Sequence, residues 1–236
     1  FGISHPAPRN AQHATRDAQL APRSPQHATR DAQTIIWQKR QFSDMRVIGQ
    51  FHNTYIVCES EAGLILIDQH AAHERVLYEQ FSARSSGALK AAQGQGLLVP
   101  ETVELGYREA GVLEKMVAEL KDMGLDIEPF GGNTFVVKAV PVLLAGREIQ
   151  PVLIEIAEKI AETRTAPGLA AALDQSRMVM ACHAAIRANQ ALSGVQIKGL
   201  LAQLDGCRNP SHCPHGRPTW IHWETRALEK SFQRIV

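Results

Sequence analysis

Apolar and polar residues alternate over 46–58, RVIGQFHNTYIVC, on both sides of Asn53-Thr54, and this pattern predicts the two strands of a hairpin. A third apolar run, LILID, follows Gly63 at 64–68. The period then changes to that of a helix over 70–81, whose inward stripe holds four residues: His70, Glu74, Leu77 and Phe81. Three strands and a helix are therefore expected in the first part of the chain.

The middle of the chain predicts a second α/β unit. Its strands are expected at 97–105, 125–129 and 134–139, and its helices at 108–123 and 152–161. Helical periodicity returns at 169–192 and 197–204, and an irregular segment, a short strand and a last helix follow at 205–218, 219–223 and up to 232–234. The segment 82–96 is small, polar and glycine-containing, which predicts a loop or hinge.

These elements predict a mixed α/β (α+β) fold with two subdomains. Residues 37–84 and 164–236 are expected to form one subdomain from both chain ends, with 85–163 inserted as the other. Residues 1–36 contain the octapeptide QHATRDAQ twice and have no apolar periodicity, so they are expected to be a disordered interdomain linker. Order is expected to begin near 35–37.

Composition indicates the class of protein but does not indicate what the protein binds. The chain has 236 residues, 44% hydrophobic content and a formal net charge of +1, which is typical of a globular protein and neither favours nor excludes DNA binding. We expect no signal peptide and no membrane segment, and a cytoplasmic, nucleoid-associated location. Under reducing conditions four unevenly spaced cysteines are expected to be metal ligands or core residues rather than disulfide partners.

Three candidate metal ligands follow the third apolar run: Asp68, His70 and Glu74. His70 and Glu74 are four residues apart, so a helix places them on one face, in line with an apolar stripe. An ionisable group that enters the interior is costly unless it is paired or bound to a metal. The alternative is a hydrogen-bonded histidine beside a helix-starting carboxylate. Glu79 is expected to miss the metal, because five residues after Glu74 it points to the opposite side from His70.

Softer donors occur later in the chain. Cys213 and His215 stand two positions apart in the loop CPHGRP, and Cys182 lies in the predicted helix 169–192. A CxH pair is weak evidence alone, and Cys182 has the alternative of an ordinary core cysteine. Together with the earlier three, these six donors exceed the four of one tetrahedral zinc and could bridge two ions, with thiolate and imidazole selecting Zn²⁺ and the carboxylates accepting Mg²⁺ or Mn²⁺.

Four segments in this order, DQHAAHERVLYE, ACHAAIRAN, CPHGRP and FQR, resemble the C-terminal endonuclease domain of the MutL family of DNA mismatch-repair proteins. The resemblance runs from about Gln50 to Arg234. It implies a metal-dependent nickase that cuts one strand of duplex DNA, with Asp68 and Glu74 as catalytic residues and the six donors as the metal site. It further implies structural or regulatory Zn²⁺, catalytic Mn²⁺ or Mg²⁺, and supporting roles for five residues: Gln69, Glu79, His183, Arg217 and Arg234.

The resemblance also implies partners: a second copy of the chain bound through the subdomain of the chain ends, duplex DNA bound weakly, and a mismatch-recognition protein bound through the full-length protein. The stretch 95–100, QGLLVP, is similar to peptides that dock on the replication sliding clamp, with Gln95, Leu97, Leu98 and Pro100 as the contacts. The alternative for this stretch is an ordinary strand start with buried leucines.

Two features leave the function open. His183 stands where the family usually has lysine or arginine, which could weaken nicking or make it depend on pH. The alternative function is a zinc-stabilised module for dimerisation and clamp docking with little or no nuclease activity. A metallohydrolase of small substrates is disfavoured because no HExxH helix is present.

Overall fold

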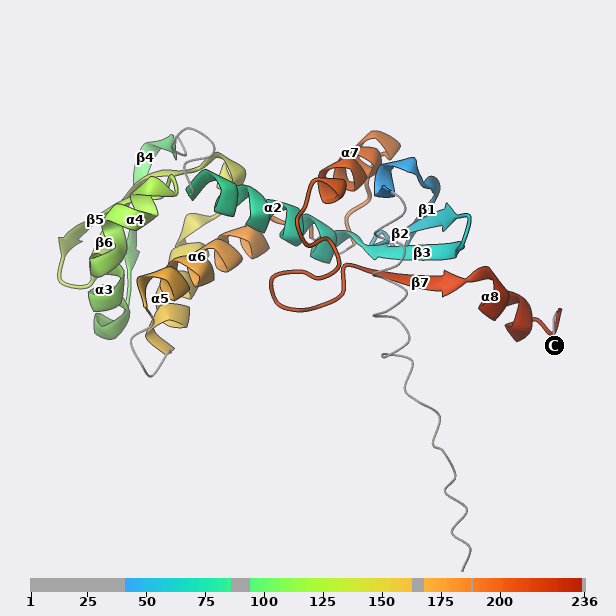
Figure 1. Cartoon of the computed structure of the whole chain (residues 1–236). Helices are drawn as coiled ribbons and strands as arrows, with labels where there is room; N and C mark the ends of the chain where they lie inside the picture. Colours follow the sequence, from blue (N-terminus) through green and yellow to red (C-terminus); the bar gives the residue numbers. More distant parts are fainter. Residues whose placement is uncertain (1–40, 86–93, 163–167, 188, 235–236) are drawn as a thin grey trace, which may run out of the picture.

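A computed structural model describes residues 41–85, 94–162, 168–187 and 189–234 (Figure 1). The predicted linker, 1–36, and the expected start of order near 35–37 lie outside these residues, as does part of the expected hinge at 82–96. The described residues form helices and two antiparallel sheets, which confirms the predicted mixed α/β class.

The first sheet has the strand order β1-β2-β3-β7, all antiparallel, and its strands span Arg46–Phe51, Tyr55–Ser60, Gly63–Asp68 and Trp220–Glu224. The predicted hairpin is confirmed, with Phe51 opposite Tyr55. Its turn contains two residues in the left-handed region, His52 at φ 50° and Asn53 at φ 48°, as a tight hairpin with right-handed twist requires. The last strand joins the sheet beside β3, so both ends of the described chain meet in one sheet.

One face of this sheet is covered by α7 (Gly194–Asp205), η1 (Phe42–Asp44) and the first half of α2 (Gln69–Ser85). Alternate strand residues such as Ile56, Ile65 and Ile67 are fully buried against them. Asp205 ties the ends of this layer together, because its carboxylate accepts the backbone N–H groups of Phe42 at 2.5 Å and Ser43 at 2.9 Å. Chain ends that are distant in sequence thus share one core.

The second sheet has the order β4-β6-β5, with strands Gly94–Glu104, Thr134–Pro141 and Asp126–Gly131. Around it are α3 (Tyr107–Leu113), η2 (Glu114–Met116), α4 (Val117–Asp122), η3 (Val142–Leu144) and α5 (Ile149–Glu162). The prediction of one helix over 108–123 was wrong: the chain tightens into a 3-10 turn at η2. Residues three apart are in line in such a turn, which buries both Leu113 and Met116.

The helix predicted over 169–192 is shorter, since α6 spans Leu169–Ala184 and the chain is extended from Ala185. Side chains of α2 bind the backbone of Ile186 in place of a next helical turn, as described below. The packing of α6 also differs from the expected division at 163/164. Its buried residues, including Val179 and Met180, belong to the core of the inserted unit and not to that of the first sheet.

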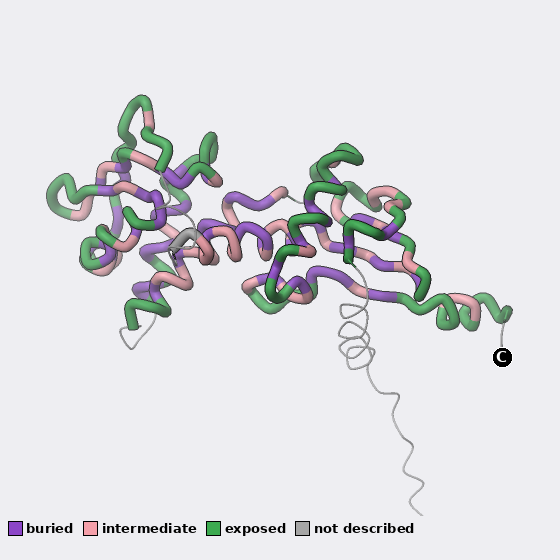
Figure 2. Tube along the Cα trace, turned by 45° about the horizontal axis from the view of Figure 1, so that its top comes forward, coloured by how far each residue is buried: buried purple, intermediate pink, exposed green. Residues whose placement is uncertain are grey.

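Two hydrophobic cores result, and α2 contributes to both of them (Figure 2). Ala72 and Val76 pack in the first-sheet core, whereas Leu77 and Phe81 pack in the second-sheet core. Beyond β7, α8 (Thr225–Ser231) projects away from both (Figure 1). No helix among the described residues combines the length and the apolar character needed to cross a bilayer.

Candidate metal centre

The site begins where β3 ends and α2 starts. Asp68 is the last residue of β3, and its Oδ1 accepts the N–H of Ala71 at 3.0 Å, which is the hydrogen bond of a helix N-cap. This cap starts α2 directly after the buried strand. Because the helix begins at Gln69, His70 and Glu74 are one turn apart on the same side of it.

Gln69, predicted as a supporting residue, is fully buried and joins three segments. Its Nε2 donates to the carbonyls of Asn53 at 2.6 Å and Gln190 at 3.0 Å, and its Oε1 accepts from Gln50 at 2.6 Å. This side chain holds the β1–β2 turn and the segment after α6 against the start of α2.

Glu74 is the centre of the site. Its side chain has no exposed surface, yet neither carboxylate oxygen accepts a hydrogen bond from the described residues. His215 Nδ1 lies 2.8 Å from Oε1, and Arg217 lies 3.5 Å from Oε2. Both basic groups are therefore near the carboxylate, but neither is aligned to donate a hydrogen bond to it. A buried carboxylate of this kind is costly unless a cation neutralises it.

Two groups of donors meet at Glu74. His70, Glu74 and Cys182 form one group, and Glu74, Cys213 and His215 form the other; within each group the ligand atoms lie within 4.8 Å of one another. Five of the six predicted donors are therefore brought together from α2, from the end of α6 and from the loop before β7. Asp68 is the sixth and belongs to neither group; one of its oxygens caps α2.

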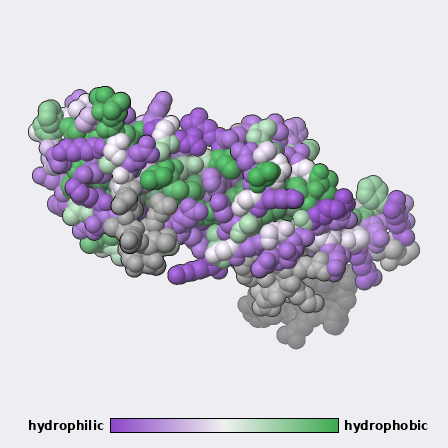
Figure 3. All heavy atoms as spheres, turned by 90° about the horizontal axis from the view of Figure 1, so that it is seen from above, coloured by the Kyte–Doolittle hydropathy of each residue, from purple (hydrophilic) through white to green (hydrophobic). Residues whose placement is uncertain are grey.

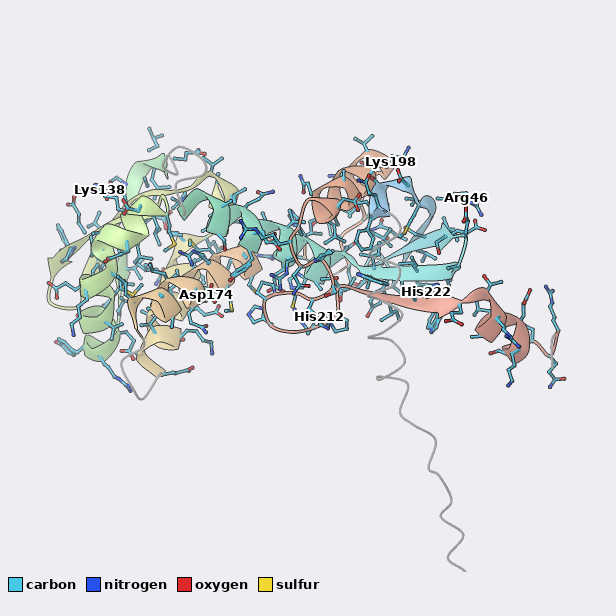
Figure 4. The ribbon with its side chains drawn as sticks, in the orientation of Figure 1. Arg46, Lys138, Asp174, Lys198, His212 and His222 are labelled. Carbon is cyan, nitrogen blue, oxygen red and sulfur yellow. The ribbon has the colours of Figure 1, made fainter. Side chains whose placement is uncertain are left out.

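The loop that carries Cys213 and His215 is held by hydrogen bonds between its own backbone groups. Cys213 N–H donates to Arg217 O at 2.8 Å, and Gly216 N–H donates to Cys213 O at 2.9 Å, with Gly216 at φ 81° where glycine is favoured. From α2, Arg75 Nε donates to the carbonyl of His212 at 2.5 Å, and Figure 4 shows His212 in this loop beside α2.

Glu79 holds the same loop from further along α2. Its carboxylate accepts the backbone N–H groups of Arg208 at 2.7 Å and Asn209 at 3.2 Å, and Arg75 lies 3.9 Å away. The structure thus places Glu79 outside both donor groups and in contact with the backbone that precedes CPHGRP.

A residue that the sequence reasoning missed is His73. Its Nδ1 accepts the N–H of Ile186 at 3.0 Å, while the Nδ1 of His70 lies 2.9 Å from the carbonyl oxygen of the same residue. Because a carbonyl can only accept, His70 carries its proton on Nδ1 and keeps Nε2 free as a ligand. The one available signal was a second histidine three residues after His70 in DQHAAHER.

Burial sets the protonation of the groups around this site. It raises the pKa of the Cys182 thiol to about 11, and the carboxylates of Glu74 and Glu155 act in the same direction. It lowers the pKa of His73 to about 4, with smaller contributions from Arg147 and His70. A hydrogen bond with Cys213 raises the pKa of Arg217. His73 is therefore a neutral acceptor at neutral pH.

The donor set fits a metal ion. Two cysteine sulfurs, two histidine nitrogens and a carboxylate are the ligands that zinc takes, and the oxygens of the buried Glu74 have no hydrogen bond of their own. Thiolates and imidazoles select a soft ion, and the carboxylate also accepts a hard one. Both donor groups need Glu74, so it is the residue that would be shared if two ions were bound.

The remaining predicted residues lie around or away from this centre. His183 Nε2 lies 2.7 Å from Glu155 Oε2, so α5 supplies a carboxylate to this imidazole. Arg217 is 57% exposed at its side chain and borders Glu74. Arg234 is exposed beyond α8, at the end of the described chain.

The stretch 95–100 lies on β4, where the pairing with β6 is interrupted. Gly96 is opposite Ala139 but Glu101 is opposite Val137, so the residues between them bulge out of the ladder. Leu97 is partly buried against the second-sheet core, whereas Leu98 is fully exposed. The stretch is therefore a strand with one outward-pointing leucine, and the alternative of two buried leucines is wrong for Leu98.

A groove of about 890 Å³ lies beside the end of α6 and is formed mainly by the first turns of α5. Four glutamates line it against one arginine and one lysine: Glu101, Glu148, Glu155, Glu158, Arg147 and Lys159. Its net negative charge repels a phosphate backbone.

The chain matches known proteins over most of its length. A family model described as the MutL C terminal dimerisation domain matches residues 48–192. DNA mismatch repair protein MutL of Geobacter sulfurreducens is 39% identical over 194 residues, which are 82% of this chain and 32% of that protein. The same protein of Citrifermentans bemidjiense is also 39% identical over 194 residues, which are 82% of this chain and 30% of that protein.

The protein of that name from Shouchella clausii is 39% identical over 189 residues, which are 80% of this chain and 28% of that protein. The chain thus spans less than a third of the length of each of these curated relatives. The match covers the strands and helices that carry Asp68, His70, Glu74 and Cys182. By this match over more than half of its residues, the chain belongs to the family of MutL C-terminal dimerisation domains.

Proposed function

We propose that this chain is a homodimeric, metal-dependent endonuclease domain that nicks one strand of duplex DNA in mismatch repair. The observation that carries the nuclease part is Glu74, a fully buried carboxylate without a hydrogen bond that is common to two groups of metal-binding side chains. Family membership supports the dimer, and the printed names of the relatives support the repair process.

The surface that would form the dimer is the second face of the first sheet. Register places apolar residues there in rows across the strands, with Val57 beside Leu66 and Ile221, and Leu64 beside Trp223. Exposed aromatic residues, Phe51, Tyr55 and Trp223, extend this face. The face seen in Figure 3, by contrast, carries hydrophobic groups only in separate areas among hydrophilic ones. Glu59 and Asp68 border these rows, and an apolar sheet face of this kind supports the assignment of a protein interface.

Sedimentation of Trp223→Glu tests the dimer. A charge placed on this apolar face has no partner there, so we expect this variant to sediment as a monomer. Tyr107→Glu is the matched control, because Tyr107 is an exposed aromatic residue beside the second sheet. If both variants remain dimeric at micromolar concentration, the first sheet does not form the interface.

The chemistry of nicking needs an activated water and a neutralised phosphate. A bound ion would lower the pKa of its water and polarise the scissile phosphodiester, with His70, Glu74, Cys182, Cys213 and His215 as its holders. We assign two further side chains of this chain to the reaction. Asp68 stands at the start of α2, and Arg217 presents an exposed guanidinium that can bind phosphate oxygens in a bidentate manner. A net charge of only +1 implies weak DNA binding in isolation.

Supercoiled plasmid incubated with Mn²⁺ tests the nuclease. We expect nicked circles from the wild-type chain and none from Asp68→Asn or Glu74→Gln. Asp126→Asn is the control, because Asp126 forms an ion pair with Lys121 in the inserted unit at 3.1 Å. Nicking by Asp68→Asn at the wild-type rate would refute the assignment. Bound zinc without cleavage by any variant would favour a zinc-stabilised dimerisation and docking module.

The exposed bulge of β4 supports docking on a sliding clamp. Leu98, one of the two leucines of the predicted docking peptide, projects fully into solvent, whereas Leu97, the other, is partly buried against the second-sheet core. An exposed leucine on a sheet edge can fill an apolar groove of a partner, with Gln95 and Pro100 on either side of the leucine pair. The clamp would thereby supply the affinity for DNA that the chain itself lacks.

A further inference from the structure

The backbone of Ile186 is held on both sides by imidazoles of α2. His70 donates to its carbonyl at 2.9 Å and His73 accepts its N–H at 3.0 Å. In a continued helix, the N–H of Ile186 would instead bind the carbonyl of Cys182, four residues earlier. Here the last helical donor is Ala185, which binds Ala181 at 3.0 Å and Cys182 at 3.3 Å. At the end of α6, His73 Nδ1 therefore replaces the helical carbonyl as the acceptor of the Ile186 N–H.

This stop has a consequence for the donors that meet at Glu74. Cys182 is in the last turn of α6, and His70 is oriented by the carbonyl of Ile186, four residues later. Both therefore depend on where the backbone of Ile186 lies relative to α2. His73 is one turn from His70 on the same helix, so its hydrogen bond fixes the position of the Ile186 backbone along α2, next to His70. His73 itself lies in neither donor group.

We propose that His73 is a positioning residue of the metal centre: through Ile186 it sets the orientation of His70 and the distance between His70 and Cys182. This inference rests on the proposed metal site and adds a residue that acts on two of its ligands without touching the ion. Residues that orient metal ligands in this way change metal affinity by about 10- to 100-fold when they are replaced.

Two substitutions separate the hydrogen bond from the packing. His73→Asn keeps an acceptor, because the amide oxygen of asparagine stands at the same number of bonds from Cβ as the imidazole Nδ1. His73→Leu fills a similar space without an acceptor. The zinc dissociation constant of each full-length chain is measured by competition with a chromophoric chelator, and the exchange rate of the Ile186 amide hydrogen is measured in zinc-free protein.

We expect His73→Leu to weaken zinc binding about 10- to 100-fold and to accelerate exchange at Ile186, and His73→Asn to restore both to within a few-fold of wild type. If His73→Leu does not fold, His73→Ala replaces it in the same comparison. Zinc affinity equal to wild type in a folded variant without the acceptor would overturn the positioning role.

The two levels of the proposal fail in different ways. A wild-type chain that binds no zinc, or a His70→Ala chain that binds it as tightly as wild type, would overturn the metal site and the role of His73 with it. Tight zinc binding by wild type, loss in His70→Ala and no loss in His73→Leu would overturn only the role of His73. Slower thermal unfolding of His73→Asn than of His73→Leu, with equal zinc affinity, would assign His73 to the fold alone.

Discussion

Replacing Glu74 with glutamine should affect stability in opposite directions with and without zinc. The carboxylate is fully buried and its oxygens accept no hydrogen bond from the described residues, and a polar group buried without hydrogen bonds is costly. An amide of the same shape is less costly to bury. The two basic neighbours of this carboxylate, Arg217 and His215, are 57% and 44% exposed at their side chains and stay solvated after the change. In chelator we therefore expect Glu74→Gln to be more stable than wild type, by about 1 kcal/mol.

Zinc should reverse this order. An ion at a hundred times its dissociation constant stabilises the folded state by about 2.7 kcal/mol. For a chain of this size each kcal/mol raises the melting temperature by about 2–4 °C, which gives roughly 5–11 °C for wild type. Both donor groups contain Glu74, so its loss should weaken binding by at least about 100-fold and leave a shift of only about 1–2 °C at the same zinc concentration.

Differential scanning calorimetry in chelator and in buffered zinc measures both effects. Asp126→Asn is the control, because Asp126 is a carboxylate of the inserted unit that forms an ion pair with Lys121 at 3.1 Å. We expect this control to lose less than about 1 kcal/mol in both buffers and to keep the full zinc shift. A zinc shift of wild-type size in Glu74→Gln, or a lower stability than wild type in chelator, would refute the account of Glu74 as a buried metal ligand.

Three further predictions concern other parts of the molecule. Gln69→Leu removes three well-formed hydrogen bonds of a fully buried amide and should lower the free energy of unfolding by about 2–4 kcal/mol in chemical denaturation. Burial raises the pKa of Cys58 from 9.0 to about 11, so the thiol stays protonated to higher pH in the folded state than in the unfolded state. Its contribution to the free energy of unfolding is therefore fully present below pH 9 and is lost as the pH rises towards 11. Cys58→Val should abolish about 3 kcal/mol of that alkaline loss in calorimetry between pH 8 and 11. Leu98→Ala should weaken clamp binding in a titration without changing zinc content, whereas Val195→Ala, which truncates an exposed apolar side chain on α7, should alter neither.

Local periodicity was sufficient for most of the fold. The hairpin of β1 and β2, the strand β3 and the start of α2 follow from alternation, turn residues and a capping aspartate, all of which act over a few residues. The end of α6 could not be predicted in this way. The sequence stays apolar and helical up to Leu192, and what stops the helix is a pair of imidazoles more than a hundred residues earlier in the chain.

The site shows the same limit. Motif spacing predicted His70, Glu74, Cys182, Cys213 and His215 as ligands, and the structure places the other four around the carboxylate of Glu74. Spacing did not reveal that Asp68 belongs to neither donor group or that His73 binds the backbone beside the centre. Those facts depend on which backbone groups reach α2 in three dimensions, and a linear pattern of residue types does not contain them.

The position of α2 explains why a metal at this centre would act on the whole molecule. The first half of the helix packs in the core of the first sheet and its second half in the core of the second. The ligands divide in the same way, because Cys182 ends a helix of the second core while Cys213 and His215 come from the loop that leads into the first sheet. An ion bound at Glu74 therefore links the two cores beside the helix they share. Since the dimer face lies on the first sheet and the exposed bulge on the second, the metal centre sits on the structural connection between the two proposed docking surfaces.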